Sequence, residues 1–171
     1  MIPKKDLIVK RSMLPNAGKG LFTRVPIKKG ERIVEYKGRI TSWKEVSHDE
    51  GTNGYIFYVS KNLVLDAKPF KKALARYAND ANGLHRVPGI KNNATYEVDK
   101  GHVYIKATKN IQAGSEILVD YGKEYWDVIR YNKRIDEEVN HQMKKQTARK
   151  KKTSSKNSIV RRLNQRHKKA A

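Results

Sequence analysis

Cysteine is absent from this sequence, and so are long apolar runs. The first absence excludes disulfides and cysteine-based zinc sites. The second excludes a membrane-spanning helix, which needs about 20 apolar residues, and residues 1–6 also lack the apolar core of a secretory signal. The five histidines show no close metal-ligand pairing, and there is no Gly-x-x-x-x-Gly-Lys phosphate loop. We therefore expect an intracellular protein without a metal site or a nucleotide-hydrolysing activity.

Acidic residues are scarce beside basic ones, because 17 Asp or Glu stand against 38 Lys or Arg and the formal net charge is +21. The excess is densest in residues 133–171, where 14 Lys or Arg against 3 Asp or Glu give a net charge of +11. Such a charge favours phosphate-bearing partners, since neutralising nucleic-acid phosphates releases counterions. Nucleic acid is therefore an expected partner of this tail, and a merely solvated basic surface is the alternative.

The first 120 residues have the pattern of a mostly β (α+β) body. A chain of 171 residues accommodates one compact domain and an extension. Short β-rich segments separated by Gly, Asn and Pro recur along it. They cover residues 7–11, 20–23, 32–36, 55–59, 63–66, 95–98, 102–107 and 117–120.

Two helices are expected beside these strands. Ser42 and Glu45 have the spacing of a capping box, which predicts a short helix after Ser42. From Glu124 onward, apolar residues keep helical spacing, which predicts a long helix that frays near Thr147. Beyond it, the chain is too polar to offset the entropy of ordering, so we expect disorder in isolation. The predicted domains are residues 1–126, a C-terminal helix at 127–149 and a basic tail at 150–171.

Four motifs follow one another over about a hundred residues. They are Asn16-Ala17-Gly18-Lys19-Gly20-Leu21-Phe22, Glu35-Tyr36-Lys37-Gly38, the segment from Ala75 to Asp80, and Gly114-Ser115-Glu116-Ile117-Leu118-Val119-Asp120-Tyr121-Gly122. In this order they resemble the SET domain family, whose members use S-adenosylmethionine to methylate lysines of proteins. The resemblance covers roughly residues 7–126 and implies several small β-sheets with short helices. The Cys-rich segment that follows many SET domains is missing, so the resemblance is to a compact form.

The first and third motifs are the expected cofactor site. Glycines on both sides of Lys19 let the backbone approach a ligand closely, although such a pattern alone is also typical of a turn. The resemblance implies that the backbone of Ala17, Gly18, Lys19 and Gly20 binds S-adenosylmethionine.

Asn79 could use its side-chain amide to contact both edges of an adenine ring. The Asn79-Asp80 pair is equally typical of a turn or a cap. The family usually has Asn-His here, so the resemblance carries Asn79 over to the cofactor site and puts Asp80 where the second contact would lie. Trp126 could cover the adenine.

Tyrosines form the expected substrate channel. A lysine with a pKa of about 10.4 must lose its proton before it accepts a methyl group, and this costs about 4 to 5 kcal/mol at neutral pH. A narrow aromatic channel can meet this cost by desolvating the amine. The resemblance assigns the catalytic role to Tyr121 with Tyr36, and the channel to Tyr36, Tyr96, Tyr121 and Tyr125. By the same resemblance, a tyrosine at position 96 implies mono- or dimethylation. Without the resemblance, these tyrosines would be read as core or surface residues.

Two further segments stand out. Residues 82–91 form an insertion that contains His85 and is either a substrate or nucleic-acid contact or a tolerated surface loop. Lys145-Gln146-Thr147-Ala148-Arg149-Lys150 is identical to part of a core-histone tail. The match is either a coincidence in a basic region, a site of self-methylation at Lys145 or Lys150, or a histone mimic that recruits proteins which read histone tails.

The expected function is transfer of a methyl group from S-adenosylmethionine to a lysine of a histone or another basic DNA-associated protein. A positive enzyme repels a basic substrate at long range, so acidic residues such as Asp49, Glu50, Glu97 and Asp99 would have to offset the repulsion. The alternative is a catalytically silent SET-like module that binds nucleic acid or chromatin through its charge. In this alternative, Asn79-Asp80-Ala81 marks decay of the cofactor pocket. The expected location is the nucleus or chromatin in a eukaryote or for a virus, and the cytoplasm in a bacterium.

Overall fold

The computed structural model describes residues 1–49, 52–84 and 86–168, with side chains in the last helix described up to Thr147 and at Lys150. The chain divides into two compact units, residues 1–127 and 128–171. The first unit holds eight strands among its described residues. They are β1 (Leu7–Arg11), β2 (Lys19–Thr23), β3 (Arg32–Glu35), β4 (Arg39–Thr41), β5 (Ile56–Ser60), β6 (Leu63–Asp66), β7 (Ala94–Asp99) and β8 (His102–Ala107).

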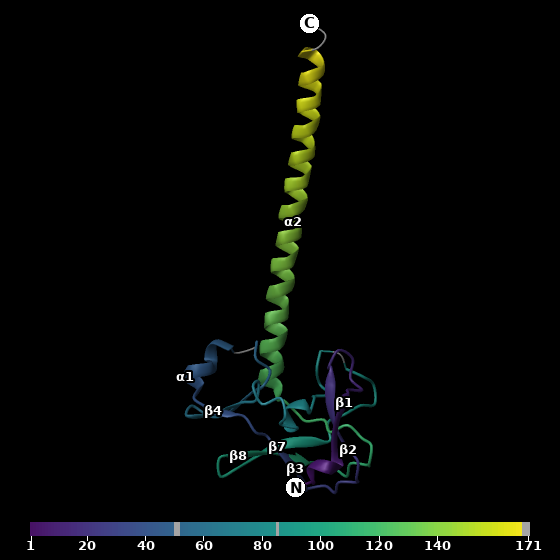
Figure 1. The fold of residues 1–171 in the computed structure, drawn as a ribbon, viewed down its shortest axis with the longest axis vertical. Coiled ribbons are helices and arrows are strands. Elements are labelled where there is room, and N and C mark those ends of the chain that lie inside the picture. The colour runs from purple at the N-terminus through teal and green to yellow at the C-terminus, as the bar shows by residue number, and fades with distance from the viewer. Residues whose placement is uncertain (50–51, 85, 169–171) are drawn as a thin grey trace. The chain divides into compact units, whose positions relative to one another are not determined.

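These strands form three small antiparallel sheets, ordered β1-β2, β3-β8-β7 and β4-β6-β5. In Figure 1, α1 (Trp43–Val46) and β4 lie on one side of the unit and β1 and β2 on the other, with β3, β7 and β8 between them. Short 3-10 turns occur at Lys4–Asp6, Ser47–Asp49 and Ala75–Tyr77. The expectation of a mostly β body with short helices is confirmed.

One expected strand is wrong and one strand was missed. Residues 117–120 make isolated bridges instead of a ladder, because this segment passes from one sheet to the next. Its bridges join Leu118 to Asn79 and Val119 to Ala94. The missed strand is β4, a three-residue edge strand with two exposed residues and little apolar signal.

The crossing segment is also the centre of the core. Ile117 and Val119 are fully buried beside Leu21 of β2 and Ile105 of β8. The Ile117 N–H donates to Leu21 O at 2.7 Å, and the Val119 N–H donates to Asn79 O at 2.8 Å. The end of this segment is thereby fixed beside Asn79. Because Tyr121 follows the segment directly, it lies near Asn79 as well.

The two expected helices differ in how well they match the structure. Helix α1 follows Ser42 as expected, but the Ser42 hydroxyl makes no cap hydrogen bond. Glu45 instead accepts a hydrogen bond from the Thr41 hydroxyl. This bond, with a second one from the Ser42 backbone, lowers the pKa of Glu45.

The final helix is longer than expected. Helix α2 runs from Lys123 to Lys168, past the expected end near Thr147, because this stretch contains neither Gly nor Pro to stop it. The three predicted domains, including disorder of residues 150–171 in isolation, stay a prediction, and residues 169–171 lie outside the described part. No described helix has enough apolar length to cross a membrane.

The burial pattern leads to a stability prediction. Ile105 is fully buried in β8, whereas Ile40 in β4 is 72% exposed. Replacing Ile105 by Ala should lower the free energy of unfolding by about 2–5 kcal/mol, because a cavity remains in the core. The matched change Ile40→Ala should alter it by no more than about 0.5 kcal/mol. Urea denaturation followed by circular dichroism measures both, and equal losses at the two positions would contradict this core.

Candidate functional site

A cleft of about 690 Å³ lies in the first unit, where the loop before β2 faces the crossing segment. One wall is the backbone of Ala17, Gly18 and Lys19, and another is the segment from Asn79 to Asp80. Tyr121, Tyr125 and Trp126 add an aromatic wall. A volume of this size is typical of a site for a cofactor-sized ligand.

A much narrower cavity, of about 60 Å³, adjoins the cleft. Its own lining includes Tyr36, Phe57 and Tyr96, and it shares Gly54, Arg76, Tyr121 and Tyr125 with the cleft. Because four lining residues are shared, the two cavities meet at Tyr121 and Tyr125. The arrangement is a broad cleft whose floor continues into a narrow aromatic pocket.

Most residues expected at the site lie on these two cavities. The cleft is lined by seven of the eight expected cofactor residues: Ala17, Gly18, Lys19, Asn79, Asp80, Tyr121 and Trp126. The narrow cavity is lined by the four expected channel residues: Tyr36, Tyr96, Tyr121 and Tyr125.

Gly20 is the exception, since it lines neither cavity. A Cβ atom there would stand 2.1 Å from Glu116 Oε1, so glycine is required by the approach of this carboxylate. A backbone contact of Gly20 with a ligand stays a prediction.

Glu116 fastens the loop before β2 to the rest of the site. Its buried carboxylate accepts hydrogen bonds from the Ser12 hydroxyl at 2.7 Å and the Met13 N–H at 2.8 Å. The amide nitrogen of Asn79 donates to Glu116 Oε1 at 3.2 Å and to Lys19 O at 3.0 Å. The Asn79 amide therefore holds the loop, which differs from the expected use of both amide groups on an adenine ring.

Asp80 is a second buried acceptor in the cleft wall. Its Oδ1 accepts from the Asn82 N–H and the Asn92 side-chain amide, both at 2.7 Å. Its Oδ2 accepts from the Tyr121 N–H at 2.9 Å and from Trp126 Nε1 at 2.7 Å. The turn that Asn-Asp sequences favour is thus present at Asn82, and the same carboxylate also reaches the aromatic wall.

The aromatic wall is a packed cluster. Tyr121 and Trp126 stack with an interplanar angle of 11° and ring centroids 5.9 Å apart, and Tyr125 meets both rings edge-on. On the other side of the narrow cavity, Tyr96 packs against Tyr36 and Phe57 with centroids 5.8 and 4.7 Å away.

The hydroxyls of the two expected catalytic tyrosines are both oriented. The Tyr121 hydroxyl donates to Ala78 O at 2.7 Å, and the Tyr36 hydroxyl donates to Tyr55 O at 2.9 Å. A phenol that donates keeps lone pairs that can accept a bond from an amine. Both oxygens are therefore suited to hold an incoming amino group.

Burial keeps these phenols neutral. Desolvation raises the pKa of Tyr36, Tyr96, Tyr121 and Tyr125, and the nearby Arg76 cation offsets only part of the rise at Tyr36. At neutral pH none of the four is a tyrosinate. They can orient and desolvate an amine, but they cannot serve as ionised bases.

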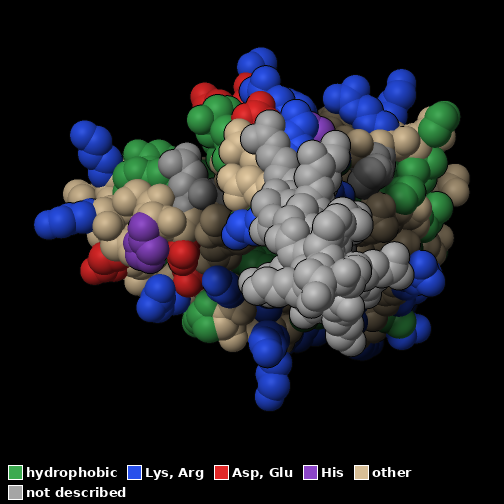
Figure 2. Space-filling view, turned by 90° about the horizontal axis from the view of Figure 1, so that it is seen from above, with side chains coloured by type: hydrophobic (Ala, Val, Ile, Leu, Met, Phe, Trp, Pro, Cys, Tyr) green, Lys and Arg blue, Asp and Glu red, His purple; other side chains and the backbone are tan. Residues whose placement is uncertain are grey.

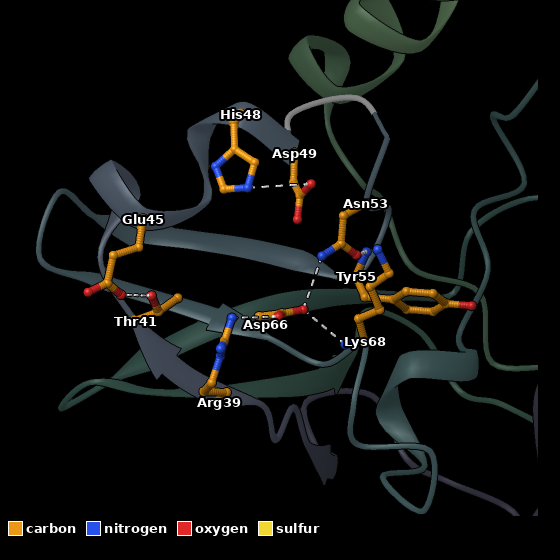
Figure 3. Close-up of polar contacts among 9 residues, drawn as sticks. All are labelled: Arg39, Thr41, Glu45, His48, Asp49, Asn53, Tyr55, Asp66 and Lys68. Carbon is orange, nitrogen blue, oxygen red and sulfur yellow. Dashed lines mark hydrogen bonds and ion pairs between the residues drawn. The ribbon is translucent and has the colours of Figure 1, made fainter.

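A polar network outside the two cavities holds the loop that contains Gly54, which lines both. In Figure 3, the Asn53 amide and the Lys68 N–H both point to Asp66, and the Tyr55 N–H donates to Asn53 Oδ1. Arg39 pairs with the same carboxylate at 3.3 Å. The network fixes Gly54, which lines both cavities, and the Tyr55 carbonyl that receives the Tyr36 hydroxyl.

Arg76 places a cation where the two cavities meet. Its guanidinium lies 4.0 Å from the centroid of the Tyr55 ring, and it donates to Lys68 O at 3.2 Å. Its buried Nε atom has no hydrogen-bond partner among the described residues. Sequence reasoning did not place Arg76, Asp66 or Glu116 at the site. The only sequence signal for them is a charged residue within or next to one of the four motifs or a short apolar strand.

The part of the chain that the structure describes contains no group of three His, Cys, Asp or Glu side chains able to hold a metal ion. Residue 85, the histidine of the insertion, lies outside the described residues.

Comparison with known proteins identifies the family of this chain. The family model for the SET domain matches residues 18–122. N-lysine methyltransferase KMT5A-A of Danio rerio is 33% identical over 121 residues, which are 61% of this chain and 32% of that protein. Histone-lysine N-methyltransferase set-1 of Caenorhabditis elegans is 28% identical over 127 residues, which are 67% of this chain and 50% of that protein. The chain thus spans about a third to a half of the length of these two relatives.

Solved structures show the same fold. The methyltransferase domain of human PR domain-containing protein 2 matches with a TM-score of 0.54 at 24% identity, covering 71% of this chain and 80% of that one. A humanised Chaetomium thermophilum Polycomb Repressive Complex 2 bound to the inhibitor GSK126 matches with a TM-score of 0.56 at 26% identity, covering 72% and 16%. The fold is therefore that of SET-type methyltransferase domains. The chain belongs to the SET domain family.

The buried tyrosines give a test in alkaline solution. The folded protein should retain the protons of Tyr36, Tyr96, Tyr121 and Tyr125 above pH 10, whereas the unfolded chain releases them near that pH. Stability contributed by these phenols is present below about pH 10 and should fall as the pH rises further. Absorbance at about 295 nm, read together with circular dichroism, should show these phenols ionising only as the protein unfolds. Ionisation of all nine tyrosines in the folded state would refute the buried cluster.

Proposed function

We propose that this chain is a protein-lysine N-methyltransferase that uses S-adenosylmethionine. The observation that carries the proposal is the junction of a cofactor-sized cleft with a narrow tyrosine-lined cavity at Tyr121 and Tyr125. A cofactor and a lysine side chain can thus enter from two sides and meet at one point. The lysine-methyltransferase names of relatives support the same assignment.

The residues of the cleft fit S-adenosylmethionine. Backbone groups of Ala17, Gly18 and Lys19 are open to the charged methionine end, and the flat ring of Trp126 suits the adenine. When bound, the cofactor supplies a methyl group on a positively charged sulfur. The protein's part is to bind it, exclude water and present the amine in line.

The narrow cavity is suited to bringing a lysine into its neutral form. Removing the proton costs about 4 to 5 kcal/mol at neutral pH, and burial among aromatic rings disfavours the charged form. The Arg76 cation at the junction acts in the same direction. The neutral phenols of Tyr121 and Tyr36 then orient the amine through their oxygen lone pairs. Tyr96 narrows the cavity, and we assign it a preference for mono- or dimethylation.

We further propose a histone or another basic DNA-associated protein as the substrate. Two relatives are named histone-lysine N-methyltransferases, set-1 of Caenorhabditis elegans and EZH2 of Chaetomium thermophilum. With such a substrate, the enzyme would act in the nucleus or at chromatin in a eukaryote or for a virus. In a bacterium it would act in the cytoplasm.

Surface charge does not by itself favour such a substrate. On the face drawn in Figure 2, Lys and Arg side chains spread around the outline, and Asp and Glu gather in fewer places. Glu97 and Asp99, which were expected to attract the substrate, are paired with Arg32, and Glu97 also with Lys106. Asp49 lies 3.8 Å from His48, and residue 50 lies outside the described part. We therefore propose that nucleic acid bound to the basic tail brings enzyme and substrate together.

The contacts of Asp80 count against one argument for the silent-module alternative. It depended on Asp80 as a sign of decay in the cofactor pocket. Asp80 instead accepts four hydrogen bonds at the cleft, two of them from the backbone N–H of Tyr121 and the indole of Trp126. A decayed pocket would not be expected to keep its buried acid fully paired.

Transfer of labelled methyl groups tests the proposal. The wild-type protein should label core histones or a bacterial DNA-binding protein, and Tyr121→Phe should reduce the rate by about 100-fold or more, as expected for one positioned polar group at a reaction centre. Tyr131→Phe, at an exposed position of α2, is the matched control and should retain full activity. Absence of labelling, together with absence of cofactor binding, would contradict the methyltransferase proposal and favour the silent module.

Self-methylation is a separate prediction. If Lys145 or Lys150 is a target, the wild-type protein alone should incorporate label, and the double change Lys145→Arg with Lys150→Arg should abolish it. Mass spectrometry of the labelled chain locates the methyl groups. Label that persists on other lysines in the double variant would refute this version.

A further inference from the structure

We propose that Asp80 is a positioning residue whose carboxylate holds Trp126 and Tyr121 together as the aromatic wall of the cofactor cleft. The inference rests on the proposed function and adds a residue that acts through its neighbours. Asp80 differs from the histidine usual at this place in the family, so its contacts in this chain have to be explained from this structure.

The carboxylate is a complete hydrogen-bonding centre. Asp80 is 4% exposed, and four donors converge on it. Two are the backbone N–H groups of Asn82 and Tyr121, and two are the side chains of Asn92 and Trp126. The partners named here are all uncharged, so the arrangement is a buried acid satisfied by neutral donors.

Only a side chain whose two terminal atoms both accept hydrogen bonds fits at position 80. An ionised carboxylate offers about four lone-pair positions and no proton, whereas an amide or an imidazole brings at least one N–H group. In an asparagine at position 80, the amide nitrogen would face two donors on one side. Asn92 cannot turn its own amide to compensate without losing the bond that its Oδ1 accepts from the Ala81 N–H at 2.8 Å.

The two bonds on Oδ2 join parts of the wall that are five residues apart. One comes from the backbone N–H of Tyr121 and the other from the indole of Trp126. The rings of these two residues stack with an interplanar angle of 11°. Trp126 also approaches Gly83, where an added Cβ atom would lie 3.1 Å from the edge of the ring. Trp126 is thus held by contacts with Gly83 and Tyr121 and by its hydrogen bond to Asp80.

The two hydrogen bonds on Asp80 Oδ2 matter more in a chain without cysteine. The Cys-rich segment that builds part of the channel in many relatives is absent, so the wall is formed by the first residues of α2, within the first unit. Trp126 is attached to the cleft by its indole hydrogen bond to Asp80 and by ring contacts with Tyr121 and Tyr125. Loss of the Asp80 acceptor should let Trp126 leave the wall and should weaken cofactor binding before it affects the overall fold.

The test uses Trp126 as its own reporter. Trp43 lies in α1 and lines neither cavity, so Trp43→Phe leaves Trp126 as the only tryptophan of the full chain. In this background, titration with S-adenosylhomocysteine should change the Trp126 emission. Adding Asp80→Asn should shift the emission to longer wavelength and weaken binding at least about ten-fold, as expected when a hydrogen bond to a charged group is lost. Asp99→Asn removes the same charge at a distant ion pair and should leave binding within about two-fold.

A second variant keeps the test decisive if Asp80→Asn fails to fold. Trp126→Phe retains a ring but lacks the indole donor, and calorimetry in the otherwise wild-type chain should show at least about five-fold weaker binding. Where both variants fold, their combined loss should be clearly smaller than the product of the separate losses, because both remove the same bond.

The outcomes separate this inference from the proposed function. Binding within two-fold of wild type in Asp80→Asn with unchanged emission, or in Trp126→Phe, overturns the role of Asp80. Fully multiplicative losses in the double variant overturn it as well. Failure of the wild-type protein itself to bind S-adenosylhomocysteine would instead overturn the proposed function.

Discussion

Backbone hydrogen bonds along residues 116–119 are the constraint on which the site depends. This segment is not a strand of any sheet, yet it bonds to β2 through Leu21 and bridges to Asn79 and Ala94. Three parts of the chain that lie up to about a hundred residues apart are therefore held at fixed spacing. Tyr121 follows directly, so its position is set by the core and does not depend on a flexible loop.

Two buried carboxylates convert this crossing into a cleft. Glu116 fastens the loop before β2 to Asn79, and Asp80 fastens the start of α2 to Tyr121. Both are satisfied by hydrogen bonds with neutral donors, which limits the cost of burying them. A third acid, Asp66, accepts a hydrogen bond from the Asn53 amide and so holds the loop of Gly54, which lines both cavities. The chemistry proposed for the site then needs little more than exclusion of water and correct orientation.

Much of the lining of the two cavities could be predicted from the sequence, because the four motifs and the tyrosines near them contain many of the residues that the fold brings together. Tyr36, Tyr96 and Tyr121 are distant in the chain but line one narrow cavity. Seven of the eight expected strand segments also match strands to within a residue. A short apolar segment bounded by turn residues predicts a strand correctly where the segment pairs in a ladder. The prediction of a strand at residues 117–120 was wrong because a segment with isolated bridges has the same apolar pattern.

The remaining features depend on contacts that no local pattern reveals. Gly20 was expected to face a ligand, but its contact is the Glu116 carboxylate, 96 residues further along the chain. The role of Asp80 depends on Asn92, Tyr121 and Trp126 meeting at one point. The end of α2 could not be read from polarity, because charged residues without Gly or Pro are compatible with a helix as well as with a tail.

The most direct measurement of the central claim is a crystal structure of the chain with S-adenosylhomocysteine and a lysine peptide. The account predicts the homocysteine part against the backbone of Ala17 to Lys19 and the adenine against Trp126. It also predicts the lysine side chain in the narrow cavity, with its nitrogen beside Tyr121. A nucleoside bound elsewhere, or a lysine that stays outside the cavity of Tyr36, Tyr96 and Tyr121, would contradict the account.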